Sequence, residues 1–449
     1  MYAKNIWKDM TSEKKAEVDT FAKEYIDFLS AAKTERLAVK ESVKLAEKYG
    51  FKPADSFKTV KAGDKLYFVN RNKNLFLYVI GEKPVSEGVR VLGAHIDSPR
   101  LDFKQNPLYE SNGFALCDTH YYGGVKKYQW VTIPLALHGV ICKKDGTTVD
   151  VNIGEDPSDP VVGISDLLPH LSQEQIKKTA DKVIEGEDLD VTIGSIPLSG
   201  EEKDAVKKNV LKILKEKYGM EEEDFMSSEL EVVPAGKARE LGFDRSMIMS
   251  YGQDDRVCAY TSLAAMLGTD AELEKTACCL LVDKEEIGSV GATGMQSKFF
   301  ENVVAELISL EGDYNDLKLR RCLANSKMLS SDVNAGYDPL FADAFEKKNA
   351  SFCGRGVVFS KFTGSRGKSG SNDANAEYIA KLRKIMDDNN VHYQMAELGK
   401  VDVGGGGTIA YIMSLYGMEV IDCGVAILNM HAPWEIASKA DVYEAKKCY

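Results

Sequence analysis

The chain has 449 residues, of which 44% are apolar, and we expect two domains because this length exceeds what one core of ordinary size holds. A formal net charge of −12 disfavours nucleic acid and anionic membranes as partners, because both are bound through clustered Lys and Arg. Nine cysteines without a C-x-x-C spacing disfavour a zinc ribbon and a disulfide framework.

The first ten residues, MYAKNIWKDM, contain no apolar segment of signal-peptide length. No later run approaches the roughly 18 apolar residues that a membrane span requires. We therefore expect a cytoplasmic protein with reduced, mostly buried thiols and no membrane partner.

The first part of the chain predicts helices, then a hairpin, then a strand. Residues 12–49 place apolar side chains at near-helical spacing and predict two amphipathic helices. In 65–81, two β-rich runs flank the polar turn RNKN and predict a β-hairpin. The apolar run in 90–102 predicts a strand that presents His95 and Asp97 on one side, since strand side chains alternate. His95 is a candidate metal ligand that Asp97 would orient, although a lone histidine is more often structural.

The residue pattern of the sequence changes after about residue 107. Short β-rich runs alternate with glycine turns up to 154, and 200–219 predicts an amphipathic helix rich in Lys and Glu. We expect an inserted β-rich domain at 107–240. The remainder, 1–106 plus 241–449, predicts a three-layer α/β domain with a mixed central sheet.

Two further strand ends carry carboxylates. In 246–267 a short strand leads to Asp254 and Asp255, and a helix is predicted from Val257. Aspartate is a good helix N-cap, and we prefer that interpretation for Asp255. A carboxylate at this place can instead bridge two metal ions about 3.5–4 Å apart, and we assign that role to Asp254.

The apolar strand in 277–294 ends at Glu285 and Glu286, before a glycine-rich turn. Adjacent glutamates are usually a solvated loop, but ligands of open α/β sheets bind at the carboxyl ends of strands. One carboxylate can therefore ligate a metal while the other takes a proton from water. Asp332 follows another apolar patch, as a turn residue or a ligand, and His431 follows a β-rich run and stands just ahead of a predicted helix.

Two imidazoles and three carboxylates suit two divalent ions, zinc above all and otherwise cobalt or manganese. The candidate ligands are His95, Asp254, Glu286, Asp332 and His431. Glu285, outside the coordination shell, is then the general base. The sequence leaves open which carboxylate belongs with which ion.

The ordered motifs GAHIDSPRLD, YYGGV, SYGQDDR, DKEEIGS, SSDVNAGYDP and NMHAP resemble the M18 family of metalloaminopeptidases, the aspartyl aminopeptidase group. The resemblance runs from His95 to His431. It implies an enzyme that removes N-terminal residues from short peptides. It implies the same five ligands for two zinc ions, with Asp97 as the partner of His95 and Glu285 as the base. The first aspartate of QDDR matches the family's bridging acid, which favours Asp254 over Asp255.

The resemblance also implies that 107–240 is a dimerisation domain. It implies that dimers assemble into a tetrahedral dodecamer enclosing the active sites. In related enzymes a histidine of this domain reaches the neighbouring subunit's active site, and His170 is similar to it, although a plain loop histidine is the alternative. Thr132, Pro134 and the glycine-rich 402–408 depart from the pattern and weaken the transfer of substrate preference.

A preference for N-terminal Asp or Glu requires a partner for the substrate carboxylate, because a buried unpaired charge is costly. Lys361 is the candidate by its position relative to family members, with Arg366 and Lys368 behind it. Backbone amides of 404–407, Gly405 and Gly406 at their centre, could bind the peptide carbonyl or an acidic side chain. The alternatives are a neutral-residue aminopeptidase, a deacylase acting on another amide, and an inactive assembly or scaffold protein.

Overall fold

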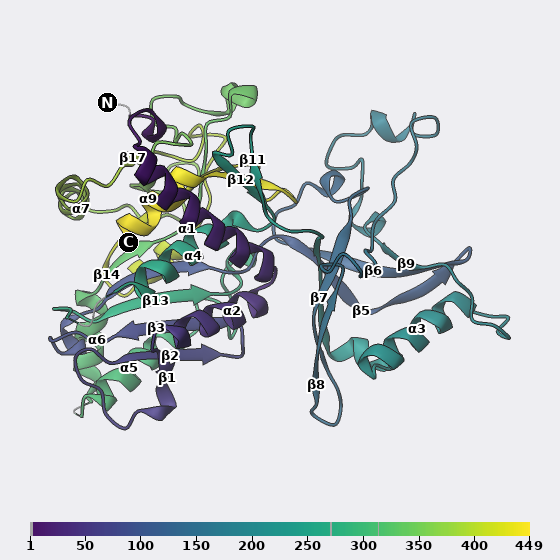
Figure 1. Ribbon diagram of the computed structural model, residues 1–449, viewed down its shortest axis with the longest axis horizontal. Coiled ribbons are helices and arrows are strands. Elements are labelled where there is room, and N and C mark those ends of the chain that lie inside the picture. The colour runs from purple at the N-terminus through teal and green to yellow at the C-terminus, as the bar shows by residue number, and fades with distance from the viewer. Residues whose placement is uncertain (1–2, 270–271, 313) are drawn as a thin grey trace. The chain divides into compact units, whose positions relative to one another are not determined.

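A computed structural model describes residues 3–269, 272–312 and 314–449. The chain divides into two compact units (Figure 1). The first comprises Met1–Asp97, Ala238–Met430 and Glu435–Tyr449, and the second comprises Ser98–Lys237 and His431–Trp434. Among the described residues, no helix combines the length and the apolar character of a membrane span.

The first unit is built on a nine-stranded mixed sheet with the order β1-β2-β3-β13-β4-β14-β18-β16-β17. Its strands are β1 (Lys52–Pro53), β2 (Lys65–Asn70), β3 (Asn74–Val79), β4 (Arg90–His95), β13 (Ala277–Val282), β14 (Lys327–Ser330), β16 (Val357–Ser360), β17 (Tyr393–Met395) and β18 (Glu419–Gly424). β13, β4, β14 and β18 run parallel, whereas β3 and β16 are antiparallel to their neighbours β13 and β18. The carboxyl ends of four parallel strands therefore share one edge.

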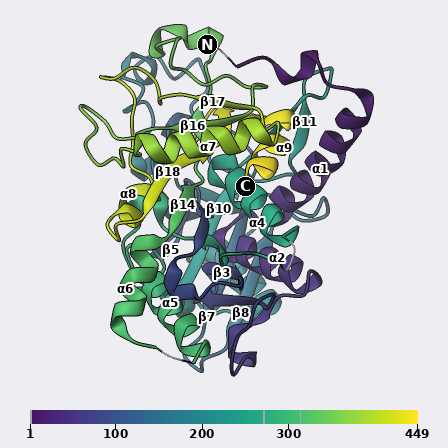
Figure 2. The same ribbon diagram turned by 90° about the vertical axis from the view of Figure 1, so that its left-hand side faces the viewer.

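Helices cover both faces of this sheet (Figures 1 and 2). They are α1 (Ser12–Ala31), α2 (Glu35–Lys48), α4 (Gln253–Leu267), α5 (Phe299–Leu310), α6 (Asp316–Asn325), α7 (Ala376–Asp388), α8 (Ile409–Ser414) and α9 (Lys439–Cys448). On β13, Cys279 and Leu281 join one hydrophobic core with α1, α2, α4, α7 and α9. Cys278 and Leu280 join another core with α5, α6 and α8. The strand is apolar throughout because both of its faces are buried.

A smaller sheet of the same unit has the order β11-β12-β20-β19-β15. Its strands are β11 (Arg239–Leu241), β12 (Met247–Ser250), β15 (Asn334–Ala335), β19 (Ala426–Leu428) and β20 (Glu435–Ser438). β12 leads directly into α4, and β20 is its antiparallel neighbour. This sheet therefore places Glu435 opposite Ser250, close to the start of α4.

The second unit is an antiparallel sheet with the order β8-β7-β10-β5-β6-β9, accompanied by α3 (Ala205–Tyr218). Its strands are β5 (Arg100–Ser111), β6 (Phe114–Tyr122), β7 (Leu135–Cys142), β8 (Thr148–Ile153), β9 (Val191–Gly194) and β10 (Ser228–Pro234). The unit begins at Ser98, whereas the sequence predicted an insertion at 107–240. β5 runs through Pro107 because the pairing with β6 shifts between Phe103 and Leu108, and this irregularity needs no backbone N–H from proline.

The local predictions for the first unit agree with the structure. The two N-terminal helices are α1 and α2, whose N-caps Thr11 and Thr34 accept hydrogen bonds from Lys14 N and Leu37 N. The predicted hairpin is β2 and β3. His431 differs in one respect, because the strand β20 stands between it and the helix α9 that we expected to follow directly.

Candidate metal centre

Three predicted site segments meet at the carboxyl edge of the parallel strands. His95 is the last residue of β4 and pairs with Val282, the last residue of β13. Glu285 and Glu286 follow β13 in a single 3-10 turn, and Asp332 follows β14, the other neighbour of β4. Residues distant in the sequence are thus brought together by strand order alone.

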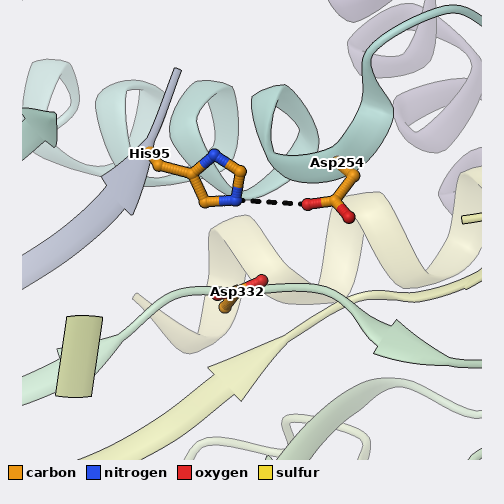
Figure 3. A group of neighbouring side chains, drawn as sticks. All are labelled: His95, Asp254 and Asp332. Carbon is orange, nitrogen blue, oxygen red and sulfur yellow. Dashed lines mark ion pairs between the residues drawn. The ribbon is translucent and has the colours of Figure 1, made fainter. Parts of the chain in front are cut away.

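The imidazole of His95 is the centre of this group. Its Nε2 lies 3.2 Å from Asp254 Oδ1 and 3.8 Å from Glu285 Oε2. Figure 3 shows the ring edge directed at the Asp254 carboxylate, with Asp332 nearby. One donor atom each from His95, Asp254 and Asp332 lie within 4.8 Å of one another, and the same holds for His95, Glu285 and Glu286.

Asp97 connects the histidine to the glutamates. Its Oδ1 lies 3.4 Å from His95 Nδ1, and its backbone oxygen lies 3.0 Å from the same nitrogen. The two carboxylate oxygens of Asp97 also accept hydrogen bonds from the backbone N–H groups of Glu285 (3.1 Å) and Glu286 (3.2 Å). One fully buried carboxylate therefore fixes both the imidazole and the turn that carries the glutamates.

Asp254 is positioned by the smaller sheet. Its backbone N–H donates to Glu435 Oε2 at 3.0 Å, and the side chain of Gln253 donates to the Glu435 carbonyl at 2.7 Å. Asp254 and Asp255 have non-helical dihedral angles, so the regular part of α4 begins after them, as predicted, although none of the described residues donates to the Asp255 carboxylate the hydrogen bond that an N-cap accepts. Asp255 is fully buried, and burial raises its pKa well above the usual range.

Asp332 is positioned by β18. A Cβ at Gly424 would overlap the backbone carbonyl of Asp332, so only glycine lets β18 approach this loop so closely. Burial, reinforced by the Asp255 charge, raises the pKa of Asp332 well above the usual range. Neither Glu435 nor Gly424 had been singled out in the sequence, because nothing local relates them to acids so far away along the chain.

This group places one imidazole among several buried carboxylates, and the excess of negative charge favours a bound cation. Burial by itself lowers the pKa of His95, but the carboxylates of Asp254 and Asp97 more than reverse this and raise it well above the usual range. Carboxylates crowded in a buried space are costly unless a positive charge accompanies them. Imidazole and carboxylate donors at this spacing fit a divalent ion such as zinc.

Two other predicted residues, His431 and His170, belong to the second unit. His431 belongs to the short segment that groups with the second unit, where its Nδ1 lies 2.9 Å from the Gly124 carbonyl oxygen. His170 is an exposed turn residue of the same unit. Both roles stay predictions.

The predicted substrate residues line two other cavities of the first unit. Lys361 lines one of about 640 Å³, with Arg355 and Arg383, and its Nζ lies 3.7 Å from Asp373. Gly405 lines a second of about 240 Å³, beside Arg366. Gly406 has open space where a Cβ would be.

Comparison with known proteins decides the family. Residues 28–449 match the family described as aminopeptidase I zinc metalloprotease (M18). The chain is a member of the M18 family. A probable M18 family aminopeptidase 1 from Clostridium acetobutylicum is 61% identical over 451 residues, covering 99% of this chain and 97% of the relative.

Two crystal structures agree with this M18 assignment. An M18 aminopeptidase from Thermotoga maritima has a TM-score of 0.96 and 47% identity, covering 100% of this chain and 98% of that one. Aminopeptidase I from Clostridium acetobutylicum has a TM-score of 0.93 and 57% identity, with the same coverage. The predicted family, α/β fold class and enzyme class are thus confirmed: this M18 protein is a metalloaminopeptidase, a hydrolase of a zinc-dependent family.

Proposed function

We propose that this M18 aminopeptidase holds two zinc ions and uses Glu285 as its general base. The five proposed ligands are His95, Asp254, Glu286, Asp332 and His431. The observation that carries the proposal is that three strand ends and the start of α4 supply two groups that share His95, one with Asp254 and Asp332 and one with Glu285 and Glu286, and that within each group the ligand atoms lie within 4.8 Å of one another. Asp254 faces His95 Nε2 at 3.2 Å, which suits the bridging position.

When bound, zinc supplies the Lewis acidity that activates water and polarises a peptide carbonyl. Glu285 lies on the same turn as Glu286, with an oxygen 3.8 Å from His95 Nε2, so it can reach a water beside the ligands. The Glu285 carboxylate takes a proton as the water oxygen bonds to the carbonyl carbon. It then gives that proton to the amine nitrogen as the C–N bond breaks, and Glu285 is restored. Asp97, which accepts hydrogen bonds from the backbone N–H groups of Glu285 and Glu286, holds their turn in place during these steps.

The test of this chemistry is Glu285→Gln. The amide cannot accept the proton, so we expect kcat to fall about 10²- to 10⁴-fold while zinc content, measured by atomic emission, stays at the wild-type level. Glu301→Gln, a half-buried glutamate of α5 paired with Lys298, is the matched control and should behave as wild type. Wild-type turnover in Glu285→Gln would remove this residue from the mechanism.

We also propose that the enzyme prefers N-terminal Asp or Glu. Lys361 supports this, because it lines a cavity with two arginines, and its ion pair with Asp373 is a long one, with 3.7 Å between Nζ and the carboxylate oxygen. The backbone amides around Gly405 and Gly406 supply a second group of donors. These features favour an anionic side chain over an apolar one.

A panel of Asp, Glu, Leu and Ala chromogenic substrates tests the preference. We expect Lys361→Ala to lower kcat/KM for Asp and Glu roughly 10-fold or more and to leave Leu unchanged, since one charge-assisted hydrogen bond is lost. Lys384→Ala, an exposed lysine of α7 paired with an aspartate, is the control. If Lys361→Ala keeps the wild-type ratio of Asp to Leu cleavage, the lysine has no such role; if the wild type prefers Leu, the enzyme is a neutral aminopeptidase.

We propose, third, that the second unit mediates assembly into dimers and a dodecamer, and that His170 serves a neighbouring subunit. Leu171 and Ile176, each 68% exposed, lie near His170 and suit burial against another copy. Light scattering of Leu171→Glu should show smaller particles than the wild type.

We propose, last, that the protein is cytoplasmic, which accords with its nine free cysteines, most of them buried.

A further inference from the structure

The strands that carry the metal centre at one end form a cavity at the other. Arg90 and Lys327 are the first residues of β4 and β14 and are register partners, so they stand side by side at the amino-terminal edge. They line a cavity of about 280 Å³ together with side chains from α4 and α7. The centre described above belongs to the opposite edge, at His95.

The walls of this cavity are apolar and its charged groups are cationic. Met266 of α4, Leu329 of β14 and Leu382 of α7 contribute the apolar surface. Arg90, Lys327 and Lys381 contribute three positive charges, and no Asp or Glu side chain is among the described residues that line it. Three cationic side chains without an Asp or Glu side chain among the described lining residues are notable in a chain whose net charge is −12.

The guanidinium of Arg90 contributes a buried hydrogen-bond donor. Its Nη1 is buried, and no acceptor among the described residues receives a hydrogen bond from it. Glu419, at the start of β18, is the register partner of Lys327 and already accepts hydrogen bonds from Asn375 at 3.1 and 3.2 Å. Lys327 lies over the Tyr378 ring, with Nζ 5.2 Å from the centroid. A buried donor of this kind calls for an acceptor, and carboxylates match guanidinium geometry best.

We propose that this cavity binds a small apolar carboxylate. The carboxylate accepts from Arg90 and lies near Lys327, while an apolar chain or ring occupies the space between β14, α4 and α7. A cavity of roughly 150 Å³ holds a benzene ring, so 280 Å³ accommodates a medium-length acyl chain or an aryl group with a short linker. Lys381 of α7 also lines this cavity and is exposed to solvent.

Calorimetric titration of the zinc-loaded full chain with octanoate tests the site, with octanamide as the uncharged probe of equal length. We expect one octanoate per chain, bound about 10-fold or more tightly than octanamide. Arg90→Met removes the guanidinium and keeps a long side chain, and should weaken octanoate about 10- to 100-fold with little effect on octanamide. Arg320→Met, an exposed arginine of α6 paired with Asp316, is the control and should bind as wild type.

Ala265→Leu provides a second variant should Arg90→Met fail to fold, because it fills the cavity from α4 and leaves every charge in place. It should abolish the binding of both probes. Octanoate bound to zinc instead of in the cavity would survive in both variants, which separates the two sites. Undiminished binding in Ala265→Leu and Arg90→Met, equal affinity for the two probes, or no binding at all would each overturn the proposal. The outcome is independent of turnover, so it does not depend on the proposed peptidase chemistry.

Discussion

Asp97 shows how one buried side chain can determine the geometry of a whole centre. Its two carboxylate oxygens accept from two successive backbone N–H groups, and one of them also faces the His95 ring. An amide in its place keeps the shape but offers only one accepting oxygen, so one of these three contacts becomes a clash of donors. Groups that orient metal ligands in this way commonly contribute 10- to 100-fold to affinity or activity.

We therefore expect Asp97→Asn to lower both zinc affinity and kcat/KM by about 10- to 100-fold. Competition with a fluorescent chelator measures the affinity. Asp338→Asn is the matched control, because Asp338 also accepts from a backbone N–H, that of Leu340, but caps a short exposed turn. A variant at Asp97 with normal zinc affinity would show that the turn is held by other contacts.

At the scale of single residues, the sequence was informative wherever a polar group ends an apolar run. His95, Glu285 and Asp332 were recognisable because strand ends are readable from hydrophobic patterning. The contact of Asp97 with the Glu285 turn was not predictable, because it joins residues 188 positions apart and depends on β4 and β13 being neighbours. Local pattern placed the start of the regular helix after Asp255, but it did not predict that this carboxylate is fully buried.

At the scale of elements, the backbone of β18 packs closely against the loop that carries Asp332. β18 passes so near the Asp332 loop that a methyl group at Gly424 would have to displace it. We expect Gly424→Ala to cost about 1–3 kcal/mol of unfolding free energy and to reduce zinc content, because the displaced backbone belongs to a proposed ligand. Denaturant unfolding and metal analysis measure the two effects.

Gly268→Ala is the control for this substitution. It lies just after α4, at a negative φ, where an added Cβ meets only ordinary contacts, at 3.5 Å or more. The unfolding free energy of the Gly268→Ala variant should be unchanged or slightly increased. Equal zinc content in Gly424→Ala and the wild type would mean that β18 yields instead of the Asp332 loop.

The helix α9 carries a pH-sensitive contact with the loop before β16. Asp441 accepts backbone hydrogen bonds from Gly354 (2.6 Å) and Gly356 (2.7 Å), and burial raises its pKa to about 7. The unfolded chain has the ordinary pKa near 4, so the native state binds the extra proton between about pH 4 and 7. The contribution of this group is therefore full at low pH and is lost as pH rises through 7.

Asp441→Asn removes this titration. We expect the unfolding free energy of the wild type, relative to the variant, to fall by roughly 1.4 kcal/mol per pH unit between about pH 5 and 6.5. Asp388→Asn, an exposed residue of α7 paired with Lys384, should show a flat difference. A flat difference for Asp441→Asn as well would mean that its carboxyl group titrates normally in the folded state.

Hydrophobic periodicity predicted helices and strands of the first unit, but it did not predict the boundary between the two units. α1, α2, β2 and β3 agree with the apolar spacing that predicted them. The predicted start of the second unit, at residue 107, is later than the observed start at Ser98, because it was based on the change of residue pattern after about Pro107, whereas β5 continues through this proline. A proline inside a strand is compatible with pairing only at an irregularity, and sequence periodicity does not show where one occurs.

For the whole molecule, the metal centre should also be a stabilising link. Its proposed ligands in the first unit come from the ends of β4, β13 and β14 and from α4, so ions bound there join four elements that otherwise meet through buried like charges. A ligand that binds only the folded state adds about 4 kcal/mol when present at a thousand times its Kd. Removing zinc should therefore both abolish activity and lower Tm.

We expect dialysis against a chelator to lower Tm by several degrees and stoichiometric zinc to restore both Tm and turnover. His95→Ala should have the low Tm from the start and should not respond to zinc, because the central imidazole is missing. His392→Ala, a half-exposed histidine near Glu444, should respond as wild type does. If Tm is unchanged by the chelator while activity is lost, zinc is catalytic only, and the buried carboxylates must be balanced by protons instead of metal.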